Sequence, residues 1–96
     1  MREYSIMDST GAVAKILPEK GATVTSFNVG GREYLYCDRD NLASSERPRC
    51  GIPFLFPAFG RFPEDGFVWE NKHYPMEIHG FAHTSSWRVL DWEKNT

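Results

Sequence analysis

The sequence predicts an all-β fold made of short strands, and two features support this prediction. Six prolines and eight glycines are scattered over 96 residues among many aromatic and β-branched residues, which is typical of frequent turns between strands. Several segments alternate apolar and polar residues with a period of two, and no capped segment with the helical period of 3.6 reaches helical length. A helical bundle is therefore excluded.

Alternation in the first half of the chain predicts four strands, at residues 2–7, 12–17, 22–29 and 32–37. The residues Ser9, Thr10 and Gly11 form the turn between the first two strands. Gly30 and Gly31 can adopt the positive φ angles of a two-residue hairpin turn. The third and fourth strands should therefore pair as a hairpin.

The middle of the chain changes character twice. Residues 38–49 are mostly polar and predict a surface loop or a single helical turn. Residues 50–61 are strongly apolar but contain Pro53 and Pro57, which cannot donate to a sheet ladder, so we expect an irregular and largely buried segment. The aromatic residues are too many for a soluble surface, and most of the following are expected in the core: Phe54, Phe56, Phe59, Phe62, Phe67, Phe81, Trp69 and Trp87.

The last third of the chain contains two further strand signals. Residues 67–76 are predicted to form a hairpin about Asn71 and Lys72. Residues 87–93 are predicted to form a final strand. The polar residues 94–96 that follow it are typical of a turn that would normally lead to a pairing strand.

Charge and composition exclude several classes of partner. Lys plus Arg total 11 against 13 for Asp plus Glu, and a net charge of −2 gives no reason to expect a nucleic acid or an anionic membrane surface. No segment approaches the ~18 apolar residues of a membrane span, so a soluble, cytoplasmic protein is predicted. Cys37 and Cys50 are too few for a disulfide scaffold and too far apart for a metal knuckle, and two reduced thiols are expected.

The densest group of unusual residues runs from Arg47 to His83. Three stretches stand out by their order and spacing: GATVTSFNVGGREYLY, ERPRCGIPFLFPAFGR and YPMEIHGFA. In these stretches the sequence resembles the aldose 1-epimerases, or galactose mutarotases, and their hexose-6-phosphate mutarotase relatives. The resemblance spans nearly the whole chain, and GIPFLFP followed by HGFA is far more specific than either motif alone.

The resemblance implies a sandwich of two large antiparallel β-sheets, of which residues 1–96 would be the amino-terminal part, as a single domain or a partial one. The family reaction interconverts the α and β anomers of an aldose: a carboxylate takes the C1 hydroxyl proton while a histidine protonates the ring oxygen. The family's general-acid histidine, sugar-binding aspartate and general-base glutamate would lie beyond residue 96. Isomerase activity would therefore need that carboxy-terminal part, and no cofactor is implied.

Carried over residue by residue, the resemblance implies four substrate-binding residues. His79 matches the histidine that hydrogen-bonds the sugar near its ring oxygen, and Arg61 matches the arginine or lysine that contacts sugar hydroxyls. Arg49 matches an arginine that holds the phosphate in the sugar-phosphate branch, a role suited to a guanidinium fork. His83 stands where that branch has a second arginine. A plain aldose is therefore expected as the partner, in preference to a sugar phosphate.

The same residues allow other interpretations. His79 and His83 have the i, i+4 spacing that serves zinc on a helix, but Gly80 argues against a helix there, and no metal is predicted. Trp69 and Phe81 lie beside the site stretches and are candidates to stack on the apolar face of a sugar ring.

Two classes of function stay open. The first is the amino-terminal part of a mutarotase of carbohydrate metabolism, which binds sugar weakly on its own. The second is a non-catalytic carbohydrate-binding or interaction module whose open strand edges pair with another chain. In either case, a partial sandwich with uncovered strand edges predicts a homo-oligomer. A following region that supplies Asn-His, Asp and Glu motifs would decide for the enzyme.

Overall fold

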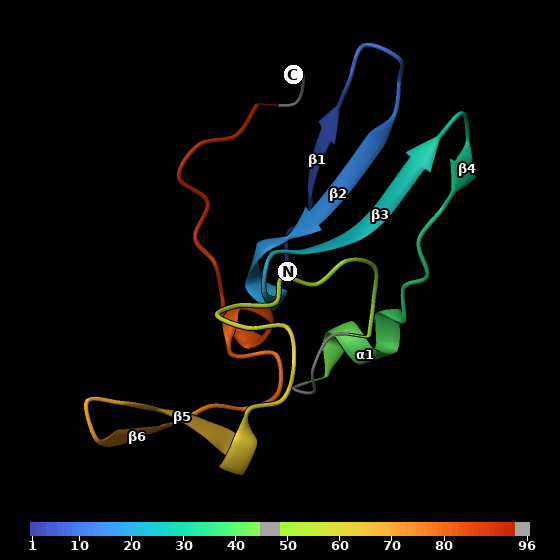
Figure 1. Ribbon diagram of the computed structural model, residues 1–96. Helices are drawn as coiled ribbons and strands as arrows, with labels where there is room; N and C mark the ends of the chain where they lie inside the picture. Colours follow the sequence, from blue (N-terminus) through green and yellow to red (C-terminus); the bar gives the residue numbers. More distant parts are fainter. Residues whose placement is uncertain (45–48, 94–96) are drawn as a thin grey trace.

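Two antiparallel sheets and one short helix form the regular structure in a computed structural model of the chain, which describes residues 1–44 and 49–93 (Figure 1). The larger sheet has the order β1-β2-β3-β4, with bounds Tyr4–Met7, Val13–Leu17, Thr23–Val29 and Arg32–Glu33. The smaller sheet pairs β5 with β6, with bounds Gly66–Trp69 and Lys72–Pro75. The helix α1 and the 3-10 turns η1, η2 and η3 span Arg39–Ala43, Pro18–Lys20, Pro63–Asp65 and Ala82–Thr84. The predicted all-β, antiparallel fold class is confirmed.

The first three strands form a meander close to the predicted positions. Tyr4 lies opposite Ile16 in the β1–β2 register, so large apolar side chains become cross-strand neighbours. The turn between these strands is held by Asp8, whose carboxylate accepts hydrogen bonds from the backbone amides of Thr10 at 2.9 Å and Ala12 at 3.0 Å. A short polar side chain that bonds its own turn in this way fixes the register of the strands on either side.

The predicted hairpin between β3 and β4 is also present, with positive φ angles of 60° and 83° at the glycines of residues 30–31. However, β4 covers only the first two residues of the predicted strand 32–37. The carboxylate of Glu33 accepts hydrogen bonds from the amides of Phe27 at 2.9 Å and Leu35 at 3.0 Å. A side chain thus takes amides that a longer strand would use in its ladder, and the strand ends early.

The polar segment after β4 contains the single helical turn that the sequence allowed. Asp38 caps α1, because its side chain accepts a hydrogen bond from the amide of Asn41 at 3.0 Å.

The prediction of two reduced thiols is wrong. Cys37 and Cys50 form a disulfide and lie opposite each other in an antiparallel bridge, with their Cα atoms 4.0 Å apart. Spacing along the chain did not reveal this pairing, because the loop that carries α1 brings its own two ends together.

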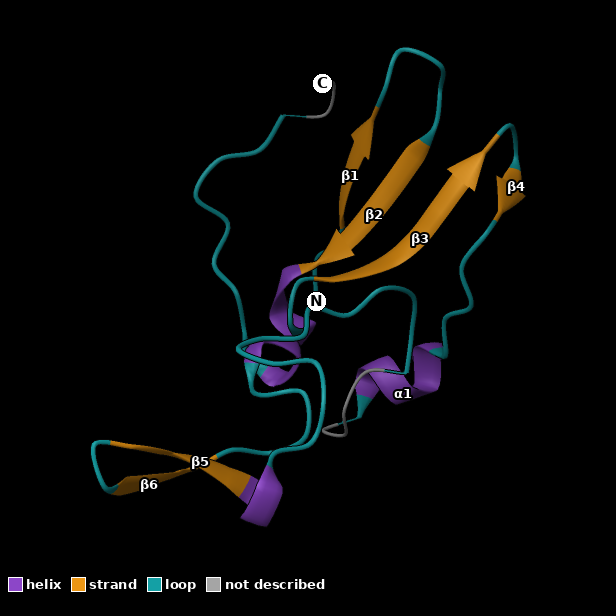
Figure 2. Cartoon of the chain, in the orientation of Figure 1, coloured by secondary structure: helices purple, strands orange, loops and turns teal. Residues whose placement is uncertain are grey.

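The apolar segment 50–61 is irregular, as predicted, and lies in loops (Figure 2). The expectation that it is largely buried is wrong: Phe56 is 60% exposed and Phe59 is 84% exposed. The expectation of an aromatic core fails with it. The large aromatic side chains that are exposed include Phe54, Phe56, Phe59, Phe67, Phe81, Trp69 and Trp87. The physical reason is that the described residues supply no second layer over this segment.

The predicted strand at residues 87–93 is wrong as well. These residues form a winding loop without regular secondary structure, and side chains anchor it to β1 instead of a backbone ladder (Figure 2). The indole of Trp92 donates a hydrogen bond to the carbonyl of Ser5 at 3.0 Å, and its ring packs edge-on against Tyr4 at 5.3 Å between centroids. Period-two alternation predicts an extended backbone, but a strand forms only where a neighbouring strand pairs with it.

The buried apolar core of the described residues is small and comprises Leu17, Leu42, Cys50 and Ala82. The accessible surface is 7127 Å², whereas a compact protein of 11.0 kDa exposes about 5,600 Å². The radius of gyration is 15.8 Å, against about 12.5 Å for a compact domain of this length. The chain is therefore more open than a self-contained domain. Among the described residues, no helix has the length and apolar character needed to cross a membrane.

Candidate functional site

Two of the stretches that carry the family resemblance lie side by side in the structure. The amide of His79 donates a hydrogen bond to the carbonyl of Gly60 at 2.9 Å, and the amide of Phe81 donates one to the carbonyl of Phe56 at 2.9 Å. Phe56 and Gly80 also form a parallel bridge. Gly80 has a φ angle of 77°, and a Cβ atom on it would overlap the Phe56 carbonyl. Only glycine allows the two backbones to approach this closely.

His79 lies at the start of this contact in an unusual backbone conformation, with a φ angle of 66°. The turn is closed by the amide of Gly80, which donates a hydrogen bond to the carbonyl of Glu77 at 2.9 Å. The Nδ1 atom of His79 is buried and has no hydrogen-bond partner within residues 1–44 and 49–93. Strained backbone and an unsatisfied buried polar atom both carry a free-energy cost, which is typical of residues kept for a function.

Arg61 follows Gly60 directly, so the hydrogen bond between His79 and Gly60 also holds the backbone of Arg61 close to His79. The guanidinium lies 3.8 Å from the Asp65 carboxylate, and both side chains are mostly exposed. Exposed pairs of this kind add little stability, so Arg61 is available to a ligand. Arg61 lines a hollow of about 430 Å³, called here the Arg61 hollow, whose full lining is Arg61, Asp65, Pro75, Met76, Glu77 and Ile78.

His83 occupies a different environment from the other predicted site residues. It lies in η3 and is 3% exposed, so it does not face solvent as a surface ligand would. Its ring packs edge-on against His79, with 6.1 Å between centroids. Its backbone lies against Gly21, where a Cβ atom would overlap the His83 carbonyl. The structure therefore brings His83 to His79, in a position to orient the His79 ring.

Arg49 lies at the other end of the segment, next to α1. Its amide donates a hydrogen bond to the side-chain oxygen of Asn41 at 2.5 Å, and its carbonyl accepts one from the amide of Asp38 at 3.4 Å. Its side chain is exposed, and Arg49 is not among the residues that line the Arg61 hollow, which lie within 61–65 and 75–78. Sequence reasoning missed Asn41, because a buried asparagine in a five-residue helix carries no motif.

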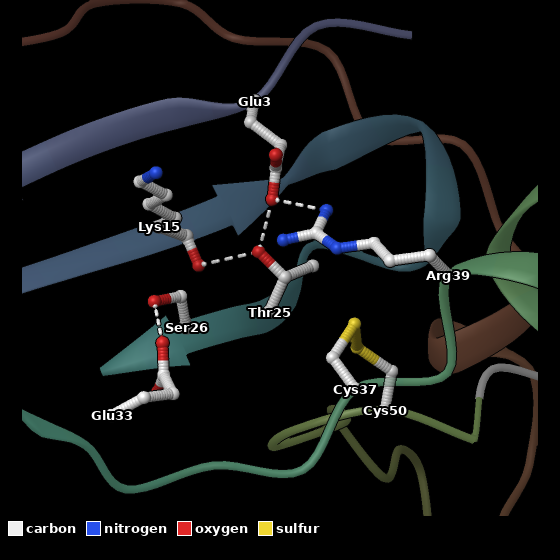
Figure 3. A network of polar contacts seen from close by, with 8 residues as sticks. All are labelled: Glu3, Lys15, Thr25, Ser26, Glu33, Cys37, Arg39 and Cys50. Atoms are coloured by element: carbon white, nitrogen blue, oxygen red, sulfur yellow. Dashed lines mark hydrogen bonds and ion pairs between the residues drawn. A yellow bond between two sulfur atoms is a disulfide. The ribbon is translucent and has the colours of Figure 1, made fainter. Parts of the chain in front are cut away.

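A polar network holds α1 against the sheet (Figure 3). Arg49 is joined to α1 by its hydrogen bond to Asn41. Glu3 accepts a hydrogen bond from the Thr25 hydroxyl, and the Arg39 guanidinium lies 3.0 Å from the same Glu3 oxygen. Burial opposes the charged form of Glu3, but the hydrogen bonds from Thr25 and Arg39 outweigh it, so the pKa of Glu3 lies below its ordinary value. The carboxylate is therefore ionised at neutral pH and links the residue before β1 to β3 and α1.

The acidic and imidazole groups do not assemble into a metal site in the described part of the chain, where no group of three or more His, Cys, Asp or Glu side chains is placed to hold an ion. The chemistry of the Arg61 hollow is that of hydrogen bonding: a guanidinium donates, and the carboxylates of Asp65 and Glu77 accept.

No protein-family model matches the chain, and no curated protein matches it. Two solved structures do. The Slr1438 protein of Synechocystis sp. PCC 6803 is 35% identical, with a TM-score of 0.86 over 96% of this chain and 32% of its own. A galactose mutarotase-like protein of Lactobacillus casei ATCC 334 is 28% identical, with a TM-score of 0.76 over 97% of this chain and 30% of its own.

The chain has a galactose mutarotase-like fold. The resemblance stated from the sequence is therefore supported at the level of the fold. This chain spans about a third of the length of either solved structure, so the activity and ligands of a whole protein with this fold are matters of proposal for it.

Proposed function

We propose that the chain is part of an aldose 1-epimerase-like protein and provides part of its sugar-binding surface, with Arg61 and His79 as the principal contacts. The observation that supports this most is the hydrogen bond from His79 to Gly60, which joins the two stretches. Arg61 lines the Arg61 hollow, and His79 is not part of its lining but directly follows Ile78, which is. The galactose mutarotase-like fold adds to it. A volume of about 430 Å³ lies in the range of small-molecule sites.

The lining of the Arg61 hollow suits a hydroxyl-rich ring. Arg61 supplies several N–H donors in a fixed fork, while Asp65 and Glu77 accept hydrogen bonds from hydroxyl groups. The side chains of Met76 and Ile78 provide apolar surface for the C–H face of a pyranose. The absence of a second arginine at position 83, where a buried histidine stands, favours a plain aldose over a sugar phosphate.

In the proposed reaction, the pyranose opens when a base removes the C1 hydroxyl proton and an acid protonates the ring oxygen as the C1–O5 bond breaks. The electron pair of the C1–O5 bond passes to O5, which becomes a hydroxyl group, and C1 becomes an aldehyde. The hydroxyl then adds back to either face of the aldehyde, which gives the α or the β anomer. His79 would hold a hydrogen bond near the ring oxygen, with His83 orienting its ring. The base would be the glutamate that the resemblance places beyond residue 96.

Titration of the isotope-labelled chain with glucose and galactose, followed by NMR, tests the binding proposal. We expect sugar-induced chemical-shift changes around Gly60 and Gly80, which are lost in Arg61→Ala and in His79→Ala. Arg32→Ala is the matched control, since Arg32 is an exposed arginine on β4 and should leave the shifts intact. Equal shifts in all four proteins would contradict a site at Arg61 and His79.

The non-catalytic module is the second candidate, and one observation favours it. The chain leaves many large apolar side chains exposed, which is typical of a surface that meets another protein. The same chain can carry both features, because none of the exposed aromatic residues is among those that line the Arg61 hollow.

A further inference from the structure

We propose that Cys37 and Cys50 form a reversible thiol–disulfide switch, which exchanges with a small thiol such as glutathione and controls how firmly α1 is held. This switch is independent of sugar binding, and neither cysteine lines the Arg61 hollow. Three observations support it: the backbone pairing on either side of the disulfide, the unequal exposure of the two cysteines, and the position of the bond next to α1.

The backbone holds the two cysteines opposite each other, in addition to the disulfide drawn in Figure 3. The amide of Gly51 donates a hydrogen bond to the carbonyl of Tyr36 at 2.7 Å, and the amide of Asp38 donates one to the carbonyl of Arg49 at 3.4 Å. The cysteines lie between these bonds and therefore form a non-hydrogen-bonded pair, the type with the closer side chains. The two sulfur atoms would thus stay within reach of each other after reduction.

The segment that carries Cys50 is also fastened to the sheet independently of the disulfide. The amides of Val24 and Ile52 each donate a hydrogen bond to the other residue's carbonyl at 3.0 Å. Gly51 allows this approach, since a Cβ atom on it would overlap the Val24 carbonyl. Breaking the S–S bond therefore leaves Cys50 in place on β3, so the reduced thiols can form the bond again.

The exposure of the two cysteines decides which sulfur atom a thiol attacks. Cys50 is 6% exposed and belongs to the buried core, whereas Cys37 is only partly buried and packs against that core. Exchange needs a sulfur atom that an incoming thiolate can reach, and buried cysteines are inert by comparison. Cys37 is therefore the attacked residue, and Cys50 is the resolving one.

The exchange has two steps. The thiolate of one small thiol attacks Sγ of Cys37, the S–S bond breaks, and its electron pair leaves with Sγ of Cys50, which takes a proton from water. A second thiolate attacks the outer sulfur of the mixed disulfide and releases the Cys37 thiolate, which is also protonated. The protein disulfide has then gained two electrons and two protons, and two small thiols have been oxidised to one small disulfide. The reverse reaction closes the bond.

The disulfide acts on α1, which begins two residues after Cys37. It closes a loop that contains α1, over a sequence separation of 13. Leu42 of α1 is 3% exposed in the same cluster as Cys50, and its amide donates a hydrogen bond to the carbonyl of Asp38 at 3.1 Å. In the oxidised chain a covalent bond opposes the opening of α1. After reduction only non-covalent contacts oppose it, so local opening becomes more frequent.

Treatment of the purified chain with glutathione tests reversibility. We expect an excess of reduced glutathione to open the bond without denaturant, and an excess of glutathione disulfide to close it again. Circular dichroism should keep its β signal in both states, and alkylation followed by mass spectrometry counts the free thiols. A bond that glutathione leaves intact, a reduced chain that unfolds, or a chain that does not reoxidise would overturn the switch and leave a purely structural disulfide.

Two single variants test the roles of the two sulfur atoms. With glutathione disulfide, Cys50→Ser should accumulate a mixed disulfide at Cys37, and Cys37→Ser should form one at least about tenfold more slowly, because Cys50 is buried. In the reduced parent chain, iodoacetamide should likewise modify Cys37 before Cys50, as peptide mapping measures, so the test does not depend on how the variants fold. Equal rates, or a faster reaction at Cys50, would contradict the assigned roles.

Hydrogen exchange followed by NMR tests the effect on α1. Reduction should accelerate exchange of the Leu42 amide about tenfold or more, since opening of α1 becomes easier. The Phe81 amide, bonded to the Phe56 carbonyl outside the closed loop, is the control and should not change. The Cys37→Ser, Cys50→Ser double variant should exchange like the reduced chain in either glutathione buffer. Equal acceleration at both amides, or none at Leu42, would show that the bond does not control α1.

Discussion

The backbone amide of His79 donates a hydrogen bond to the carbonyl of Gly60 at 2.9 Å, across a sequence separation that no local motif spans. This bond places the histidine of the HGFA stretch beside Arg61, the last residue of the GIPFLFPAFGR stretch. The neighbouring contact between Gly80 and Phe56 keeps the two segments in register.

Gly80→Ala should destabilise the chain by about 2–5 kcal/mol, because the new methyl group meets the Phe56 carbonyl and the residue must also hold a positive φ angle. Gly30→Ala is the control, since Gly30 has a φ angle of 60° but open space around it. It should cost only about 1–2 kcal/mol. Urea denaturation curves measure both. Equal losses in the two variants would show that the close approach to Phe56 contributes nothing.

Reduction of the Cys37–Cys50 disulfide should lower the free energy of unfolding by about 3 kcal/mol, the loop-closure entropy for a sequence separation of 13. Thermal unfolding with and without dithiothreitol measures the effect, and the Cys37→Ser, Cys50→Ser double variant should not respond to dithiothreitol. Mass spectrometry after alkylation gives an independent check. Two alkylated cysteines in the oxidised, unfolded chain would contradict the disulfide. Since disulfides are rare in the cytosol, the bond does not favour the predicted cytoplasmic location.

Glu33 should make the free energy of unfolding depend on pH in the acidic range. Hydrogen bonds from the Ser26 hydroxyl and from the amides of Phe27, Leu35 and Tyr34 lower the pKa of Glu33 from 4.5 to about 2. A carboxyl whose pKa is lower in the folded chain stabilises it above pH 4.5, and this contribution fades as the pH falls from there toward 2. Denaturation curves across that window should show a steeper loss in the parent chain than in Glu33→Gln. Parallel curves would contradict the prediction.

The isolated chain should associate with itself at tens of micromolar, because strand edges and apolar side chains are uncovered. Light scattering measures the mass. A clean monomer at that concentration would count against the predicted homo-oligomer.

Mutarotation of freshly dissolved α-glucose by the isolated chain should be no faster than with free imidazole at the same concentration. The reason is that ring opening needs a positioned base and a positioned acid together, each typically contributing about 10²–10⁴-fold. Polarimetry measures the rate. Saturable turnover that is lost in His79→Ala would contradict the prediction and direct attention to Asp65 and Glu77, the carboxylates of the Arg61 hollow.

The sequence by itself determined the local features of this protein. Alternation and turn residues located β1, β2, β3 and the β5–β6 hairpin to within a few residues, since side-chain direction and turn geometry depend on neighbours in the chain. The motifs singled out His79 and Arg61 as candidate site residues, and the structure brings their two stretches together. The role of these residues as sugar contacts stays a prediction.

Only the tertiary structure showed which residues from distant parts of the chain contact one another. Residues 87–93 form a loop instead of a paired strand, Cys37 is bonded to Cys50, and His83 is buried against His79. Phe56 is exposed although it is as apolar as any core residue. Burial depends on a covering layer and pairing depends on a partner strand. Both are contacts between distant segments. Hydropathy and periodicity therefore show which residues could be buried or could pair in a strand, and tertiary packing decides which of them are.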